Sequence, residues 1–236
     1  YSMGFPLHSE DSCNAIGQAY YGPVILITDA LSYSTTDIFA AGFQDNKVGY
    51  ILGTSDNTGA GGANKWTYDE LVKALGREGK TRFPALPNQA SFDLALRRSV
   101  RVGENEGRPL EELGVTPDRR HYMTRKDLMR QNSDLVRHAA QILATQPCYG
   151  LSVQAGKGKN RTLRVSATSK VRPRDQRKRI ARVEILIDGR SRKSLNARNG
   201  KLSPTNVVIG KSRKFDWQVQ AFDYDDKLVA IARRQR

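Results

Sequence analysis

The sequence predicts an α/β domain followed by an all-β domain, and two observations support this division. Up to about residue 146, apolar runs alternate with segments of helical periodicity, whereas the remainder holds short alternating strands separated by turn residues. The charge divides at the same place, because residues 151–236 contain 23 of the 39 Lys and Arg residues but 7 of the 24 Asp and Glu residues. We therefore predict two domains, 1–146 and 147–236, joined near the stretch QPCYG.

The first predicted strand and helix enclose a short turn rich in hydroxyl groups. Residues 23–28, PVILIT, form a continuous apolar run with β-branched side chains, as expected of a strand buried on both faces. Residues 35–46 follow with apolar side chains at helical spacing. The next predicted elements are a strand at 48–54, a glycine-rich loop at 56–64, a helix at 67–79 and one or two strands at 91–103.

Two further segments have sequence features that are typical of helices. Thr67 followed by Glu70 three residues later is a capping-box pattern, which is typical of a helix N-terminus. Residues 124–145 predict one long amphipathic helix. Its apolar side consists of Leu128, Leu135, Ala139, Ile142 and Leu143.

The second domain is predicted to be a β-sandwich of immunoglobulin or fibronectin type, because short strands recur between turn residues over about 85 residues. The predicted strands are at 151–156, 162–169, 181–189, 206–210, 215–226 and 228–234. Alternation predicts that Val183, Ile185, Ile187, Phe215, Trp217, Val219 and Ala221 face the core, and we assign Phe222 and Tyr224 to the same apolar cluster.

Composition argues against several classes of protein. No apolar run approaches the ~20 residues that span a bilayer, and no signal peptide is visible. Cys13 and Cys148 are predicted to be two separate buried thiols. No metal-ligand spacing appears, so we predict no metal and no organic cofactor.

The stretch ALSYSTTDIF, residues 30–39, raises the main functional question. A strand that breaks into a hydroxyl-rich turn and then a helix is a place where hydrolases hold a nucleophile. The same residues would also serve as an ordinary helix N-cap through Ser34 or Thr35. These ten residues by themselves leave both interpretations open.

Three segments in order resemble one family, the S41 serine peptidases, which include the carboxy-terminal processing (tail-specific) proteases and the tricorn core protease. YSTTDIFAAGFQDN (33–46) is similar to the nucleophile segment of that family, and LGTSDNTGAGGAN (52–64) is similar to the glycine-rich segment that follows it. PLEELGVTPD (109–118) is similar to the family's closing E-x-x-G-V-x-P-D motif. The resemblance covers about residues 20–125 and implies a ClpP/crotonase-like α/β core.

The resemblance assigns roles to particular residues. It implies that Ser34 is the nucleophile and that the backbone N–H of Thr35 is an oxyanion donor at the helix N-terminus. Asp37 stands where the family usually has Glu, and Glu111 matches the supporting glutamate of the closing motif, with Glu112 as its neighbouring alternative.

The resemblance does not identify a general base in this sequence. Ala60 occupies the position of the lysine used by the processing proteases, and Lys65 reads as a solvated loop residue. The pattern is closer to the tricorn-like branch, whose base is a histidine from the first half of the catalytic domain. His8, His121 and His138 each read as structural, with His121 in a linker and His138 exposed on its helix.

We therefore expect the base to lie outside this sequence. Few residues precede the 23–28 strand, so we expect the remaining N-terminal half of the catalytic domain to come from another segment of a longer protein. The resemblance implies a serine-type endopeptidase that acts on proteins or peptides in a periplasmic or secreted location. The alternative is a catalytically inactive S41-like scaffold that binds a partner through its basic sandwich.

The basic second domain has two interpretations. Residues 170–182 and 189–201 are dense in Arg and Lys, as expected of a surface that contacts an anionic membrane or cell-wall polymer. The same residues also suit charged loops and edge strands that discourage aggregation. We predict no nucleic-acid partner, because few aromatic side chains are interleaved with the basic ones.

Overall fold

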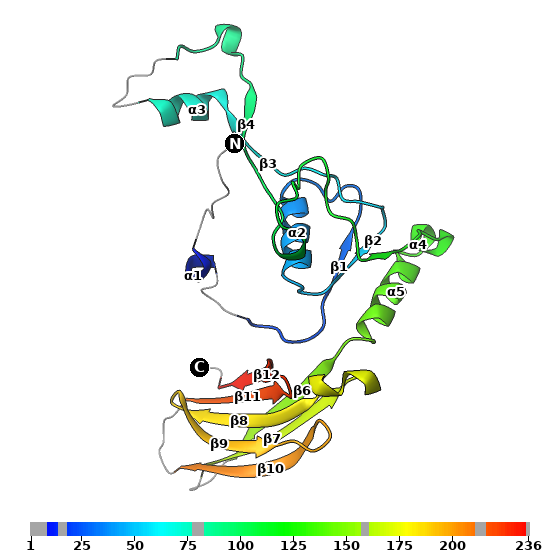
Figure 1. Ribbon diagram of the computed structural model, residues 1–236, viewed down its shortest axis with the longest axis vertical. Helices are drawn as coiled ribbons and strands as arrows, with labels where there is room; N and C mark the ends of the chain where they lie inside the picture. Colours follow the sequence, from blue (N-terminus) through cyan, green and yellow to red (C-terminus); the bar gives the residue numbers. More distant parts are fainter. Residues whose placement is uncertain (1–8, 14–17, 77–82, 157–160, 211–215, 235–236) are drawn as a thin grey trace. The chain divides into compact units, whose positions relative to one another are not determined.

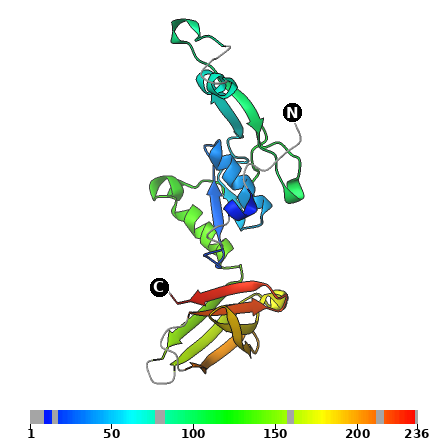
Figure 2. The same cartoon turned by 90° about the vertical axis from the view of Figure 1, so that its left-hand side faces the viewer.

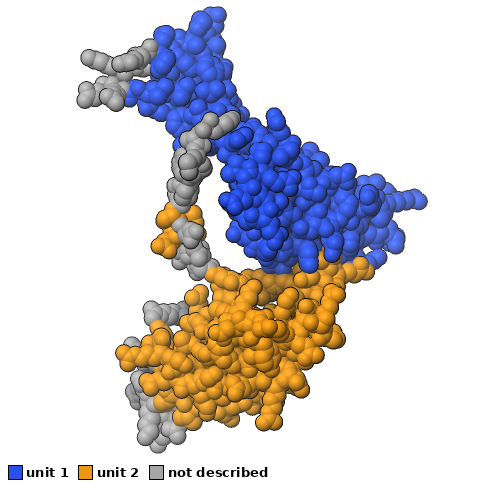
Figure 3. All heavy atoms as spheres, in the orientation of Figure 1, with its two compact units in different colours: residues 1–5, 24–140 blue, residues 6–23, 141–236 orange. Residues whose placement is uncertain are grey.

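The computed structural model describes residues 9–13, 18–76, 83–156, 161–210 and 216–234 (Figure 1). The chain divides into two compact units, one of residues 24–140 and the other of residues 141–236 with the described part of 6–23 (Figure 3). The predicted boundary between residues 146 and 147 stays a prediction. None of the described helices is long and apolar enough to cross a membrane.

The first unit contains a small parallel sheet. Its strands are β1 (Ile25–Thr28), β2 (Tyr50–Gly53) and β5 (Arg119–Arg120), in the spatial order β1-β2-β5. Helix α2 (Thr35–Asp45) follows β1 and contacts both β1 and β2. The buried apolar side chains of this unit's core are Ala40, Ala41, Phe43, Ile51, Leu110 and Val115.

A two-stranded antiparallel ribbon interrupts this unit (Figures 1 and 2). It consists of β3 (Ala63–Thr67) and β4 (Asp93–Arg98), with α3 (Tyr68–Leu75) directly after β3. The Thr67 side chain accepts a hydrogen bond from the Glu70 N–H, and the Glu70 carboxylate accepts one from the Thr67 N–H, so the predicted capping box is confirmed. The helix ends at Leu75, earlier than predicted, and residues 77–79 of the predicted helix lie outside the described residues.

The predicted long helix at 124–145 is two helices, α4 (Arg125–Met129) and α5 (Ser133–Leu143). The chain breaks because Gln131 and Asn132 adopt left-handed conformations, with φ of 50° and 56°. The Asp127 carboxylate then accepts the N–H groups of Asp134 and Leu135 at the start of α5. Leu128 is consequently 76% exposed instead of facing the core, whereas Leu135 and Ala139 are buried as predicted.

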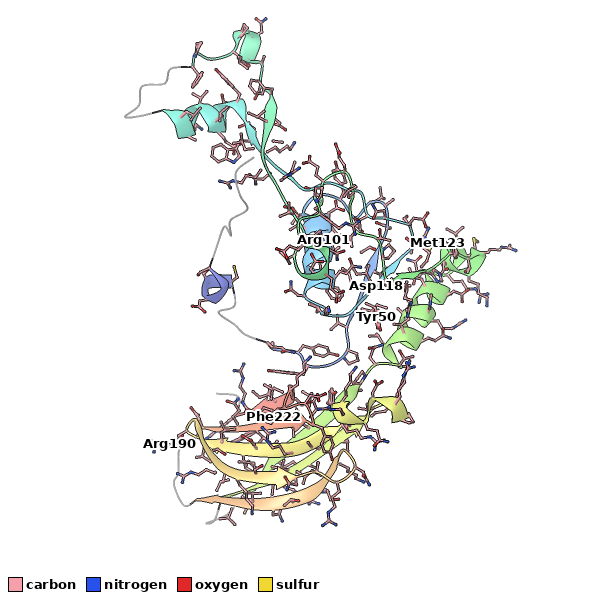
Figure 4. The ribbon with its side chains drawn as sticks, viewed as in Figure 1. Tyr50, Arg101, Asp118, Met123, Arg190 and Phe222 are labelled. Atoms are coloured by element: carbon pink, nitrogen blue, oxygen red, sulfur yellow. The ribbon has the colours of Figure 1, made fainter. Side chains whose placement is uncertain are left out.

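Carboxylates hold the far end of α2. Asp45 is 2% exposed and forms a two-pronged ion pair with Arg101, at 2.6 and 2.8 Å, beside the helix (Figure 4). Burial by itself would raise the pKa of the Asp45 carboxyl, but hydrogen bonds, first that from Arg101, outweigh this effect and lower it. Asp118 accepts the Ile51 N–H at 2.7 Å and the Gln44 side-chain amide at 3.0 Å, which joins β2 to α2.

The described strands of the second unit form two antiparallel sheets around one core. The first sheet has the order β10-β7-β6 and the second has the order β12-β11-β8-β9. Buried side chains from both sheets belong to the same apolar cluster, which includes Val165 and Val219. The strands are β6 (Cys148–Ala155), β7 (Arg161–Lys170), β8 (Ile180–Ile187), β9 (Arg190–Asn196), β10 (Lys201–Gly210), β11 (Trp217–Asp223) and β12 (Leu228–Arg233).

Alternation predicted most of this core correctly. Val183, Ile185, Ile187, Val219 and Ala221 are buried in it, and Trp217 packs against it. Phe215 lies outside the described residues.

The assignment of the two remaining aromatic residues to that core was wrong. Phe222 stands outside the core cluster, and the Arg182 guanidinium lies 4.2 Å from the centre of its ring (Figure 4). Tyr224 is 54% exposed because it follows β11, beyond the alternating strand. The thiols of Cys13, at the end of α1 (Glu10–Cys13), and of Cys148 are also exposed, so their predicted burial was wrong.

Strand β9 was not predicted, because six of its seven residues are polar or basic, as in a loop. It pairs with β8 at the edge of its sheet, where Lys193 lies opposite the buried Ile185 and Arg190 lies opposite Ile187. Both cationic residues are exposed, so β9 places solvated charges along the edge of the sheet. Charged side chains on an edge strand discourage edge-to-edge pairing, which supports the second interpretation of the basic residues.

We expect Asp45→Asn to destabilise the first unit strongly, because it leaves the buried Arg101 guanidinium without its charged partner. The free energy of unfolding should fall by about 3–5 kcal/mol. Hydrogen exchange of the α2 amides measures this change. The nearby exposed pair of Lys47 and Glu104 provides the control: both side chains are at least 70% exposed, and Lys47→Ala should cost about 0–1 kcal/mol. Similar losses in both variants would contradict the role given to the buried pair.

Candidate active site

The two serines of the hydroxyl-rich turn after β1 differ in their hydrogen bonding. The Ser32 hydroxyl donates to Asp29 Oδ1 at 3.1 Å and accepts the Asp29 N–H at 3.1 Å. Ser32 is therefore engaged in the local turn. Ser34 is exposed, and its side chain makes no capping hydrogen bond to α2.

The backbone of Ser34 is unlike that of an ordinary helix N-cap. An N-cap residue normally has extended angles and accepts an amide hydrogen bond through its side chain. Ser34 instead has φ 60° and ψ −117°, a combination that favours glycine and that costs another residue on the order of 1–3 kcal/mol. A strained strand-to-helix turn that leaves a serine hydroxyl exposed is the geometry of a nucleophile turn.

At the start of α2, one backbone N–H next to Ser34 in the sequence is left without an acceptor in the described part of the chain. The Thr36 N–H donates to the Tyr33 carbonyl and the Ile38 N–H to the Ser34 carbonyl, each at 3.2 Å. Among the described residues, none accepts a hydrogen bond from the Thr35 N–H. This unpaired N–H lies at the positive end of the helix dipole, where a developing oxyanion would be stabilised.

Asp37 links α2 to the glycine-rich loop. Its side chain is fully buried, and its carboxylate accepts the Ala60 N–H at 3.1 Å and the Gly61 N–H at 2.8 Å. Two successive N–H groups that converge on one anion form a backbone nest. Ala60 has φ 64°, which turns its N–H and that of Gly61 toward the same carboxylate.

The loop lies directly against the serine turn. A Cβ added to Gly61 would lie 2.9 Å from the Ser34 nitrogen, so a side chain at this position would displace the turn. The Gly59 N–H donates to the Ser32 carbonyl at 2.9 Å. The second segment of the resemblance is therefore in contact with the first.

The closing segment packs onto the same loop. The Glu112 N–H donates to the Ala60 carbonyl at 2.8 Å, and the Val115 N–H donates to the Thr58 hydroxyl at 2.8 Å. Glu111 is half-buried, with its backbone beside Gly62, and its carboxylate makes no hydrogen bond with a described residue. The structure thus brings Glu111 to the loop that contacts Ser34, without a direct contact to the Ser34 hydroxyl.

Lys65 is not suited to act as a base. Its ammonium forms an ion pair with Asp93 at 2.5 Å, and both side chains are largely exposed. This pairing raises the pKa of Lys65, whereas a neutral amine base needs a lowered pKa. Its interpretation as a solvated lysine agrees with this geometry.

The histidines are arranged differently from the prediction. His121 follows β5 and is 7% exposed, so it is not part of an exposed linker. Its Nε2 lies 2.8 Å from Asp127 Oδ2, and its Nδ1 lies 3.2 Å from His138 Nδ1. His138 is half-buried on α5 instead of exposed, because its ring packs beside that of His121. His8 lies outside the described residues.

Both ring nitrogens of His121 are therefore engaged away from Ser34. A base must have a nitrogen within hydrogen-bond reach of the serine hydroxyl, and neither described histidine has such a contact. Within the described part of the chain, no group of three His, Cys, Asp or Glu side chains could hold a metal ion.

Comparisons with known proteins agree with the three segments. The model of peptidase family S41 matches residues 7–120, so the resemblance of this segment to that family is confirmed. The members of this family are peptidases, which are hydrolases that act on proteins or peptides. None of the curated proteins matches the chain.

One solved structure that aligns with part of the chain is the M60 catalytic domain of ZmpC from Clostridium perfringens, determined in complex with the sialyl T antigen. The alignment has 13% identity and a TM-score of 0.22, over 37% of this chain and 16% of that chain. This chain therefore spans about a sixth of the length of that protein. A similarity at this level supports no inference about fold or function.

We expect Asp37→Asn to loosen the glycine-rich loop, because the amide side chain loses the charge that binds two N–H groups. Protection of the Ala60 and Gly61 amides from hydrogen exchange should fall by about 10- to 150-fold, equivalent to about 1.5–3 kcal/mol. Asp56→Asn is the matched control, since Asp56 lies in the same loop but is 94% exposed. Its effect should stay below about fivefold, and an equal effect would refute the special role of Asp37.

We expect the Asp127 carboxylate to make the stability of the first unit depend on pH in the acid range. Burial by itself would raise the pKa of this carboxyl, but the hydrogen bonds that it accepts, above all from His121, hold the pKa well below its ordinary value. Because the folded pKa is lowered, the stabilisation is complete above about pH 4–5 and is lost as the pH falls toward the folded pKa. In urea unfolding between pH 3 and 7, the free energy of unfolding should fall less steeply toward low pH for Asp127→Asn than for the wild type. Identical slopes would contradict this assignment.

Proposed function

We propose that this chain carries the nucleophile of a serine-type endopeptidase that works through an acyl-enzyme. The observation that carries the proposal is the turn at Ser34, whose strained backbone, exposed hydroxyl and missing cap bond differ from those of an N-cap. The match of residues 7–120 to the model of peptidase family S41 supports the same interpretation. The free N–H of Thr35 is the proposed oxyanion donor, and Glu111 is the proposed supporting carboxylate.

The proposed reaction proceeds in two steps. Ser34 Oγ attacks the scissile carbonyl carbon while the hydroxyl proton passes to a general base, and the oxyanion accepts a hydrogen bond from the Thr35 N–H. Collapse of the tetrahedral intermediate expels the amine, which takes the proton from the base. Water then hydrolyses the Ser34 ester by the same route and releases the acid product.

We propose that the base is supplied by a residue outside this sequence. Two observations support this: His121 is committed to Asp127 and His138, and the Asp93 ion pair keeps Lys65 protonated. Apolar side chains around the nucleophile are also exposed, as expected of a surface that another segment completes. They are Ile27, Leu31, Tyr33, Ile38 and Phe39, with exposed fractions between 41% and 87%.

We also propose a finer classification of the two units. The parallel sheet with α2 after β1 is compatible with a ClpP/crotonase-like core, and the two-sheet second unit is compatible with an immunoglobulin-like sandwich. Arg190, Arg192 and Lys193 on β9 form no ion pair with another described residue, so a contact with an anionic membrane or cell-wall surface is proposed for this strand (Figure 4). The proposed location is periplasmic or secreted.

The proposed nucleophile is tested by covalent labelling. Full-length protein treated with a fluorophosphonate should gain one adduct, and peptide mass spectrometry should locate it on Ser34. Ser34→Ala should abolish labelling, because no other Ser, Thr or Tyr among the described residues has a positive φ. Ser32→Ala is the matched control two residues away and should retain at least about a third of the rate, since Ser32 acts only within the Asp29 turn.

Two outcomes would contradict the proposal. Absence of labelling in the folded wild type, under conditions that label an active serine protease, would favour the inactive binding scaffold. An adduct on Ser32 would mean that the nucleophile was assigned to the wrong serine.

A further inference from the structure

Tyr33 is an exposed aromatic residue directly before the proposed nucleophile. Its side chain is 59% exposed, although burial of a tyrosine ring is normally favourable. The Tyr33 carbonyl accepts the Thr36 N–H, so its backbone belongs to the same turn that sets the Ser34 conformation. The ring is therefore attached to the most constrained part of the site.

The glycine-rich loop fixes this ring from one side. A Cβ added to Gly59 would lie 2.5 Å from Tyr33 Cδ2, and one added to Gly61 would lie 2.9 Å from Tyr33 Cζ. Both positions must lack a side chain for the ring to lie on the loop backbone. One edge of the ring is held in place while much of its surface stays open to solvent.

A second apolar side chain lies beside Ser34 on α2. Ile38 is one helical turn after Ser34, so the two residues share a side of the helix, and the Ile38 N–H donates to the Ser34 carbonyl at 3.2 Å. Ile38 is 44% exposed. The nucleophile is thus flanked by an aromatic ring held by the loop and by an aliphatic side chain on a rigid helix.

We propose that Tyr33 and Ile38 form an apolar wall of the substrate site, which favours an apolar side chain on the peptide residue next to the scissile bond. This inference rests on the proposed function, in which Ser34 attacks that bond. A substrate residue whose carbonyl carbon reaches Ser34 Oγ must place its side chain near the residues adjacent to Ser34. Apolar contact there removes exposed ring surface from water, whereas a small side chain leaves it exposed.

The inference is tested with two peptidyl diphenyl phosphonates that differ only in the side chain beside phosphorus, benzyl in one and methyl in the other. Labelling of full-length wild type should be at least about tenfold faster with the benzyl probe. Tyr33→Ala should slow the benzyl reaction by about tenfold and the methyl reaction by less than about threefold. Tyr33→Phe, which keeps the ring, should behave as the wild type.

Tyr122→Ala is the matched control, because Tyr122 is a more exposed tyrosine, at 77%, in the segment after β5. It should leave both rates unchanged. If Tyr33→Ala fails to fold by circular dichroism, Tyr33→Leu replaces it and should reduce the benzyl preference only in part, because leucine keeps an aliphatic contact but lacks the ring.

The remaining outcomes separate this inference from the one on which it rests. Equal slowing of both probes by Tyr33→Ala would make Tyr33 a support of the turn and would overturn the specificity role. Unchanged rates would also overturn it, and would mean that another segment covers the ring. If neither these probes nor the small fluorophosphonate labels the wild type, the proposed function itself fails and this inference fails with it.

Discussion

The candidate site depends on one buried interaction, the acceptance of two backbone N–H groups by the Asp37 carboxylate. Asp37 is on the helix that begins just after Ser34, and its partners Ala60 and Gly61 belong to the loop that follows the next strand. A buried carboxylate is costly unless its hydrogen bonds are satisfied, so helix and loop must keep this register. The contact between Gly61 and the Ser34 nitrogen, and that between Ala60 and Glu112, follow from it.

The opposite end of the same helix is fixed by comparable means. Asp45 is bound by Arg101, and Gln44 is bound by Asp118, which also accepts the Ile51 amide of the central strand. Helix α2 is therefore held at both ends by buried or partly buried polar groups, and its middle packs into the small core. A conformation as strained as that of Ser34 persists where the surroundings determine it from several sides.

The chain nevertheless presents a site whose chemistry is incomplete among the described residues. A strained serine turn, a free helix amide and a glycine-rich loop converge, but the buried imidazole nearest in sequence to the closing motif is engaged by Asp127 and His138. That imidazole stabilises the junction between β5 and the two short helices that replace one long helix. The second unit adds an edge strand whose cations lie opposite buried isoleucines, so part of its positive charge protects a sheet edge.

Periodicity and short motifs in the sequence were sufficient for most elements and for the joint appearance of three peptidase-like segments. The strand before the turn, helix α2, the Thr67 capping box and the alternating core of β8 and β11 depend on neighbours within a few residues, which a sequence displays directly. The break at Gln131, the positions of Phe222 and Tyr224 and the existence of β9 were missed, because each depends on partners distant in the chain or on an edge position.

The sequence by itself therefore determined the order of elements and the residues eligible to be a nucleophile. It left open whether Ser34 caps a helix or attacks a substrate, since a serine before a helix suits both roles. Only the tertiary structure showed that Ser34 is not an ordinary N-cap, through a backbone angle of φ 60° and the absence of a capping bond. The physical reason is that this conformation is unfavourable locally and is maintained by contacts from the loop more than twenty residues away, which no local pattern of residues records.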